Sequence, residues 1–234
     1  MNTVPDEKIE FKTQQERVYY LLREAILRGK FEPGKSVTLR GIASMLDVSL
    51  MPVRESLRRL TTERALELLS NRRIAVPEMT QLKLEEIYRI RIVLECEAAV
   101  RALPYIDDAA LAQLVALNEK HNKAIANGDI ENYIYLNFIF HRTLYNLGQP
   151  QVLMPILESL WLQIAPFMRM VYEEIFAQGN FSDMEDQHEQ AIAAIIAGDS
   201  DALEAAIRGD MLDGAIGLQT AMGWPPQAIS LLKG

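Results

Sequence analysis

The chain has 234 residues, of which 49% are hydrophobic and 24% charged, and its formal net charge is −8 at pH 7. This composition supplies enough apolar material for a packed core and excludes a disordered chain, and no apolar run approaches the roughly 18 residues of a membrane-spanning helix. One cysteine, Cys96, excludes a disulfide framework and a cysteine zinc cluster, and with no signal-type segment at the N-terminus we expect a cytoplasmic protein without a membrane partner.

The chain opens with residues 1–11, which are polar and predict a flexible N-terminus. An amphipathic helix is predicted over residues 13–28, because apolar side chains recur there at helical spacing. Gly29 is a natural stop for this helix. The segment 31–36, which contains proline and glycine, then predicts a turn.

Two short helices joined by a tight turn are predicted over residues 36–62. Their apolar stripes lie on either side of residues 47–49 and consist of Leu39, Ile42, Ala43 and Leu46, then Val53, Leu57 and Leu60. Ser49 is placed to cap the second helix. Arg54 and Arg58 lie four residues apart, beside the apolar stripe of that helix. This pattern is typical of a helix-turn-helix, and a solvated arginine face with Glu55 pairing Arg58 is the plain alternative.

A wing of two short strands is predicted next, over residues 66–69 and 74–76, with its tip at residues 70–73. Six helices are predicted after the wing, and their short connections indicate an antiparallel bundle. These helices span residues 80–102, 107–127, 129–146, 150–178, 182–197 and 199–222. Ser182 and Glu185 are predicted to form a capping box at the start of the fifth helix.

The fold class is therefore predicted to be mostly α. Residues 12–77 would form a winged helix-turn-helix domain, residues 78–222 an all-α antiparallel helical bundle, and residues 223–234 a C-terminal tail. Charge divides in the same way, because residues 1–80 carry 14 basic and 11 acidic side chains, whereas residues 81–234 carry 10 and 21. A mildly basic domain on an acidic body suits a protein whose first part meets phosphate while the rest is repelled from it.

Polar side chains interrupt the apolar stripes of several helices in the predicted bundle. Asn137 and His141 lie four residues apart, so both can reach one atom from adjacent turns. His188 and Asp210 lie on the stripes of two later helices. Imidazole and oxygen ligands of this kind can bind a divalent metal. The alternative for each residue alone is a buried polar group with a local partner, and the coincidence of several helices favours a shared site.

Arg91 likewise lies where an apolar side chain is expected, on the inward stripe of the first bundle helix. Glu95 lies one turn further along and can neutralise it. Arg91 is therefore either half of a buried ion pair or a group held for a ligand. His121 lies among polar residues and is expected at the surface.

Residues 48–60, VSLMPVRESLRRL, preceded by FEPG at residues 31–34, resemble the winged-helix DNA-binding domain of GntR-type bacterial regulators. The resemblance covers about the first third of the chain and implies double-stranded DNA as a partner. The chain departs from the family pattern at Arg64 and Arg73, where glycine is usual, so each arginine must adopt a positive φ or reshape its turn. Leu50 stands where relatives often carry arginine.

Three later segments, RIVLE at 91–95, NFIFH at 137–141 and HEQAI at 188–192, resemble the effector domain of the FadR branch of that family, called FCD. Many members of that branch hold a metal through an Asp or Asn, the histidine four residues later and two further histidines. The ligands that the resemblance implies here are Asn137, His141, His188 and Asp210. Asp210 stands in the place of the last histidine, and zinc, manganese or nickel would suit such a set. A metal-free pocket in which Asp210 pairs with Arg91 or a histidine is the alternative.

The resemblance implies a ligand-responsive transcriptional regulator, not an enzyme, which binds a short palindromic operator as a homodimer. The residues expected at DNA are Arg40, Ser49, Met51, Arg54, Arg58, Arg72 and Arg73. A small organic acid would bind in the bundle at the metal, at Arg91, or at both. One alternative is a DNA-binding dimer without an effector. Another is a bundle metalloenzyme, but the Glu-x-x-His unit that such enzymes use twice is found once, at residues 185–188.

Overall fold

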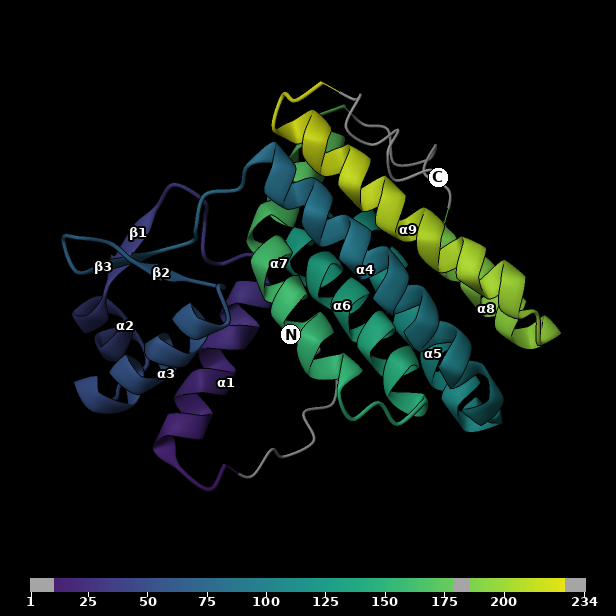
Figure 1. Ribbon diagram of the computed structural model, residues 1–234, viewed down its shortest axis with the longest axis horizontal. Helices are drawn as coiled ribbons and strands as arrows, with labels where there is room; N and C mark the ends of the chain where they lie inside the picture. The colour runs from purple at the N-terminus through teal and green to yellow at the C-terminus, as the bar shows by residue number, and fades with distance from the viewer. Residues whose placement is uncertain (1–10, 179–185, 226–234) are drawn as a thin grey trace.

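The N-terminal part of the chain folds as three helices and a small sheet, and the rest folds as a helical bundle (Figure 1). The structure, a computed structural model, describes residues 11–178 and 186–225. Its first elements are α1 (Gln14–Leu27), β1 (Ser36–Thr38), α2 (Leu39–Met45), α3 (Leu50–Thr62), β2 (Glu67–Leu68) and β3 (Arg73–Ala75). These elements, α1 to β3, are called the winged-helix domain below. The mostly α class and the winged helix-turn-helix predicted from the sequence are confirmed.

The core of the winged-helix domain lies where α1 packs on α3. Both helices turn their apolar stripes inward, and the buried side chains there are Val18, Leu22, Ile26, Val53, Leu57 and Leu60. The residues of α3 that this core does not use are left on its outer side, and Arg54 and Arg58 are among them. Apolar periodicity alone therefore decides which face of α3 is free.

The sheet has three antiparallel strands in the order β1-β3-β2. The sequence predicted two strands and placed residues 36–38 in the helix-turn-helix, which is wrong. In β1, Ser36 lies opposite Ala75 and Thr38 lies opposite Arg73 of β3. A strand of three residues is too short to show a period of its own, so only its pairing with β3 reveals it.

Of the two arginines expected at glycine positions, Arg64 and Arg73, only Arg64 has a positive φ. Arg64 has φ +59° and thus takes the left-handed conformation. At the wing tip the residue with positive φ is Arg72, at +61°, and not Arg73. The turn ends earlier than predicted because the Arg73 N–H donates to Asn71 Oδ1 at 3.0 Å. Arg73 itself lies in β3, where its Nε donates to Ser36 Oγ at 2.7 Å and a second guanidinium nitrogen donates to the Ser36 carbonyl.

Ser49 occupies the N-cap of α3, with φ −69° and ψ 163°, but its side chain makes no capping hydrogen bond. The predicted capping role of its hydroxyl is therefore wrong. Thr38, by contrast, caps α2 by accepting the Gly41 N–H at 3.0 Å. The first N–H groups of α3 thus lack a partner from the Ser49 side chain.

The bundle consists of α4 (Gln81–Ala102), η1 (Leu103–Tyr105), α5 (Asp108–Ala126), α6 (Ile130–Leu147), α7 (Leu153–Gln178), α8 (Gln187–Ala197) and α9 (Ser200–Ala221). α4 packs against α6, α7 and α9, while α5 packs on α6 and α8, and α8 packs on α9. Asp186 caps α8, and the predicted capping box, Ser182 with Glu185, lies outside the described residues. Among the described residues no helix is both long and apolar enough to cross a membrane.

The winged-helix domain rests on the bundle through α1, which packs on α6 and α7. Arg23 of α1 pairs with Glu158 of α7 at 3.1 Å. Gly29, just after α1, has φ +67°, and a side chain there would meet Arg169 Cβ at 3.4 Å. The positive φ is the reason for glycine at this position, because a contact of 3.4 Å is of ordinary length.

Candidate functional site

The residues expected at DNA lie on the winged-helix domain, and most of them are exposed. The exposed ones are Arg40, Ser49, Met51, Arg54, Arg58 and Arg72. Arg58 has a side chain that is 82% exposed, and its Nε lies 3.7 Å from Glu55, so that ion pair holds it weakly. Arg73 is the exception, because its guanidinium is bonded to Ser36 and links β3 to β1. The expected DNA contact of Arg73 stays a prediction, and in the structure its guanidinium joins the two strands.

Three of the four candidate metal ligands converge inside the bundle. His141 of α6, His188 of α8 and Asp210 of α9 each bring one ligand atom within 4.8 Å of the others. His141 Nε2 lies 3.0 Å from Asp210 Oδ2 and 3.3 Å from His188 Nε2. In a tetrahedral site with bonds of 2.0–2.1 Å, two ligand atoms lie about 3.3 Å apart. The spacing of these three side chains therefore fits one divalent cation.

Asn137, the fourth candidate, lies one turn before His141 on α6, and its Nδ2 is 3.4 Å from His188 Nε2. The oxygen and nitrogen of an amide are assigned from the surrounding hydrogen bonds, and half a turn about the last side-chain bond exchanges them. That rotation presents Oδ1 of Asn137 to the same point. The amide thus adds an oxygen ligand that a cation can use.

Hydrogen bonds behind the two imidazoles place a proton on Nδ1 of each ring. His188 Nδ1 lies 3.1 Å from Asn118 Oδ1, and the amide nitrogen of that side chain donates elsewhere, so the ring must donate here. His141 Nδ1 lies 3.0 Å from the hydroxyl of Tyr145, which gives its one proton to Glu95. His141 is therefore a donor as well. Both Nε2 atoms face the cluster, and a ligating histidine is commonly oriented in this way.

His141, His188 and Asp210, called the cluster here and below, are arranged to hold a positive charge among them. Burial keeps the pKa of His188 well below its usual value, so this imidazole stays neutral with a lone pair on Nε2. Burial by itself raises the pKa of Asp210, but the nearby His141, which also bonds to the carboxylate, outweighs this effect and keeps that pKa well below its usual range. Two imidazole nitrogens beside a carboxylate are stable when a proton or a metal ion lies among them.

Arg91 is buried close to this cluster, and its charge is already paired. Its Nε lies 2.7 Å from Glu95 Oε1, which confirms the ion-pair alternative for these two residues. Glu95 is fully buried and also accepts from Trp161 Nε1 and the Tyr145 hydroxyl, at 3.0 Å each. A terminal nitrogen of Arg91 faces the Met211 sulfur at 3.1 Å. A thioether is a weak acceptor, so that donor is open to a stronger one.

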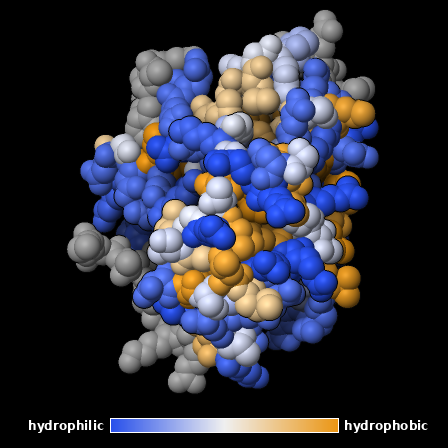
Figure 2. All heavy atoms as spheres, turned by 90° about the vertical axis from the view of Figure 1, so that its left-hand side faces the viewer, coloured by the Kyte–Doolittle hydropathy of each residue, from blue (hydrophilic) through white to orange (hydrophobic). Residues whose placement is uncertain are grey.

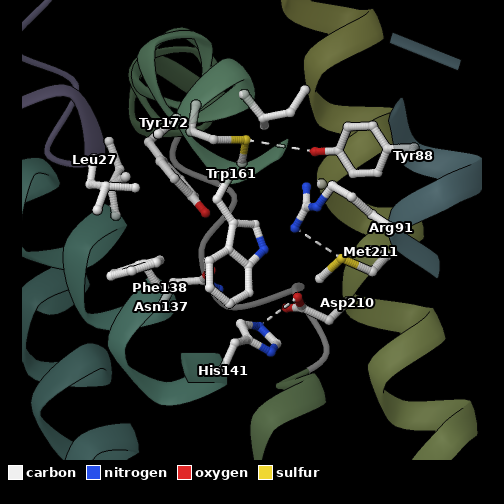
Figure 3. A pocket seen from close by; sticks show the side chains of 15 residues that line it. Leu27, Tyr88, Arg91, Asn137, Phe138, His141, Trp161, Tyr172, Asp210 and Met211 are labelled. Atoms are coloured by element: carbon white, nitrogen blue, oxygen red, sulfur yellow. Dashed lines mark hydrogen bonds and ion pairs between the residues drawn. The ribbon is translucent and has the colours of Figure 1, made fainter. Parts of the chain in front are cut away.

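Two cavities flank the cluster. The first, of about 70 Å³, has Arg91 and Asp210 on the wall formed by α4 and α9, with Leu27 on the opposite side (Figure 3). Leu27 is the last residue of α1, so the winged-helix domain contributes to this cavity. The second cavity, of about 120 Å³, is lined by His121 among others. Asn137 and Asp210 line both cavities, which places the cluster between them.

His121 is buried, with 6% of its surface exposed, and the prediction that it lies at the surface is wrong. Its ring stacks on Tyr133 with the centroids 4.0 Å apart and lies 4.9 Å from the ring of His188. Neither ring nitrogen has a hydrogen-bond partner among the described residues, and burial lowers the pKa of His121 to about 4. The spacing along α5 indicates this burial, since the inward stripe is Leu114, Leu117, His121 and Ala124.

Each of the two parts of the chain matches a known protein family. Residues 14–76 match the family described as bacterial regulatory proteins, gntR family, and residues 86–212 match the FCD domain. The chain is 33% identical to the HTH-type transcriptional regulator McbR of Escherichia coli strain K12 over 154 residues, which are 66% of this chain and 70% of that protein. It is 28% identical to the gluconate operon transcriptional repressor of Bacillus subtilis strain 168 over 187 residues, 76% of this chain and 74% of the repressor.

Solved structures agree with these matches. E. coli McbR/YncC superposes with a TM-score of 0.77 and 28% sequence identity, covering 95% of this chain and 98% of that one. A GntR regulator from Rhodococcus sp. RHA1 superposes with a TM-score of 0.71 and 24% identity, covering 90% and 98%. The second similarity concerns the fold alone.

Proposed function

Because the chain belongs to the gntR family of bacterial regulatory proteins and carries an FCD domain, we propose that it is a transcriptional regulator whose operator affinity responds to a small organic acid. Regulators of this family bind operator DNA, and McbR and the gluconate operon repressor are transcriptional regulators, not enzymes. The sensing half of the proposal rests on one observation. The cavity beside His141 and Asp210 is also lined by Leu27 of the winged-helix domain.

In this proposal α3 enters the major groove of double-stranded DNA, as the second helix of a helix-turn-helix does. Arg54 and Arg58, exposed on successive turns of α3, contact guanine or phosphate, and Arg72 adds a contact from the wing. One helix-turn-helix covers only a half-site, so a homodimer binds a short palindrome. A regulator of chromosomal genes acts in the cytoplasm.

The outer side of α4 supports the proposed homodimer. Leu82, Ile90 and Val93 recur there at helical spacing and are 75%, 46% and 66% exposed. An apolar stripe of this kind commonly marks an interface between proteins. We place the second copy of the chain on this face, which leaves α3 free to meet DNA.

The donor set fits a divalent metal, for which His141, His188 and Asp210 are the ligands and Asn137 is a fourth. Two imidazoles with a carboxylate and an amide suit zinc, manganese or nickel. When bound, such an ion supplies a positive charge that attracts a carboxylate. Tyr145 and Asn118 hold the two rings in position from behind.

The first cavity sets the size of the effector. Its volume of about 70 Å³ is roughly half that of the 150 Å³ cavity that admits benzene in a mutant lysozyme. A small carboxylate would accept from the Arg91 nitrogen that now faces Met211. Because Leu27 lines the same cavity, an occupant touches the end of α1. An effector that binds more tightly to one placement of the winged-helix domain on the bundle favours that placement. Operator affinity then changes by the difference between the effector's binding free energies for the two placements.

The test uses the full-length protein with an operator selected from a random duplex library. We expect specific retardation of that duplex, a metal close to one per chain by elemental analysis, and a change in retardation with at least one member of a panel of small carboxylates. Arg54→Ala should abolish specific retardation, because it removes the exposed arginine nearest the start of α3.

The matched control is Arg208→Ala, which makes the same substitution on α9 in the bundle. It should leave retardation unchanged. Equal operator affinity of Arg54→Ala and wild type at moderate salt would overturn the proposed DNA contact. Protein that carries no metal and responds to no carboxylate would overturn the sensing half and leave a DNA-binding dimer.

A further inference from the structure

The first turn of α3 presents two large apolar side chains to solvent. Leu50 and Met51 begin this helix and are 38% and 63% exposed. Figure 2 views the molecule from the side of the winged-helix domain and shows apolar surface bordered by hydrophilic side chains. These two side chains do not pack in the core, and they lie on the helix that is proposed to bind DNA. Exposed apolar side chains at a binding surface indicate an apolar group on the partner, here the DNA.

The same face of α3 continues into arginines. Arg54 lies four residues after Leu50 and three after Met51, and Arg58 lies one turn beyond, so all four side chains share one side of the helix. All four are exposed. The face is therefore apolar at its N-terminal end and cationic behind it. Flanking positive charge suits a polyanion, and it excludes a purely apolar protein surface as the occupant of this face.

The N-terminal residues of a recognition helix are the ones that contact base edges. Neither Leu50 nor Met51 can donate a hydrogen bond, and the Met51 sulfur is only a weak acceptor. On the floor of the major groove, the apolar group available to such side chains is the 5-methyl of thymine. The guanine contact that an arginine at position 50 would favour is not available to Leu50.

We infer that Leu50 and Met51 recognise thymine through its 5-methyl group, so that each operator half-site carries a thymine where the first turn of α3 meets the bases. This inference rests on the proposed DNA-binding function and specifies which base that function reads. Arg54 and Arg58 then supply guanine or phosphate contacts further along the same half-site. The apolar pair thus determines specificity, and the arginines supply most of the affinity.

The experiment replaces single thymidines by deoxyuridine in the operator selected from the random library. Deoxyuridine pairs as thymidine does and lacks only the 5-methyl. For the wild-type full-length protein we expect Kd to rise about fourfold when the contacted thymine of one half-site is replaced, the cost of exposing one methyl-sized apolar group. Replacement in both half-sites should raise Kd by about tenfold or more.

The variants Leu50→Ala and Met51→Ala assign the effect to its residues. Alanine favours a helix, and both side chains are exposed, so these variants should fold, as circular dichroism can check. At least one of them should bind the thymine operator more weakly and no longer distinguish thymine from uracil. Arg58→Ala, which removes the other exposed arginine of this face, should weaken binding to both duplexes and keep their ratio. Ile196→Ala, which removes a side chain 68% exposed on α8, controls for loss of apolar surface elsewhere.

Binding that is insensitive to every deoxyuridine substitution would overturn the inference and leave operator binding intact. A uracil penalty that persists in both Leu50→Ala and Met51→Ala would overturn it as well. Selection that enriches no sequence would overturn the proposed sequence-specific function, and this inference with it. The failures of the two proposals are therefore distinguishable.

Discussion

Asp210 shows how one side chain can decide what a buried cluster binds. Its carboxylate lies 3.0 Å from His141 Nε2 and 3.9 Å from His188 Nε2, and its side chain is 20% exposed. The two imidazoles supply lone pairs, and the carboxylate supplies the negative charge. Metal affinity should therefore depend on this charge and much less on the shape of the side chain.

Asp210→Asn should lower metal affinity by more than about 100-fold, because even outer-shell changes cost 10–100-fold and this change removes a charged ligand. The measurement is metal content after dialysis against a weak chelator. Asp213→Asn is the matched control, since Asp213 lines the second cavity and accepts from Gln187 at 3.1 Å without belonging to the cluster. Equal metal content of the two variants would contradict the assignment of Asp210.

Cys96 provides a second residue-scale prediction, which concerns pH. The thiol is buried on α4, and burial raises its pKa to about 11. Because the thiolate is the reactive form and its population grows with pH up to the pKa, only about one thiol in 1000 is ionised at pH 8. Native protein should therefore react very slowly with iodoacetamide at pH 8 and faster at pH 10. Unfolding in urea should expose the group, and rapid labelling of the native state at pH 8 would contradict its burial.

At the scale of a helix, two ion pairs of the same spacing have different surroundings. Arg91–Glu95 in α4 and Arg208–Glu204 in α9 are each four residues apart with an N–O distance of 2.7 Å. The side chains of the first pair are 8% and 0% exposed, and those of the second are 40% and 45% exposed. Burial is therefore the variable that distinguishes the pairs.

Arg91→Met should lower the free energy of unfolding by about 3–5 kcal/mol, because it leaves Glu95 buried without its counter-charge. Arg208→Met should cost at most about 0.5 kcal/mol, the value of an exposed pair at helical spacing. Urea denaturation of the two variants measures both quantities. The double variant Arg91→Met with Glu95→Gln should recover part of the loss. Similar losses for Arg91→Met and Arg208→Met would show that α4 tolerates a solvated Glu95.

The turns of the winged-helix domain carry a second prediction at this scale. Arg64 and Arg72 have φ near +60°, a backbone conformation that costs energy for residues other than glycine. Arg64→Gly should stabilise the protein by about 1 kcal/mol, since relief of strain exceeds the added flexibility of the unfolded chain. Arg89→Gly, on an exposed turn inside α4, should destabilise it by about 1 kcal/mol. Thermal unfolding measures both, and the same sign for the two changes would contradict the strain.

At the scale of the whole molecule, the winged-helix domain and the bundle share a continuous apolar core. α1 joins them, with Arg23 paired to Glu158 and Leu27 reaching the first cavity. In the proposed function, α1 carries a change at the cavity to α3, because α1 packs on that helix. The same contact should also link the unfolding of the two parts.

Leu22→Ala, in the core of the winged-helix domain, should lower the free energy of unfolding by about 2–5 kcal/mol. Trp161 and Trp224 are the two tryptophans of the chain, and neither belongs to the winged-helix domain. If the two parts unfold together, Leu22→Ala should shift the fluorescence transition as far as the circular dichroism transition. A fluorescence midpoint that stays at its wild-type value would show that the bundle unfolds alone.

The sequence by itself determined the helices and the outward face of α3, because each depends on spacing within a few turns of one helix. It also identified Asn137 and His141 as neighbours, since they lie on adjacent turns. Tertiary structure alone decided that residues 36–38 form a strand and that Tyr145 and Asn118 orient the two imidazoles. The physical reason is that these outcomes depend on contacts between α5, α6, α8 and β3 and their distant partners, and no local period along the chain records which segments pack together.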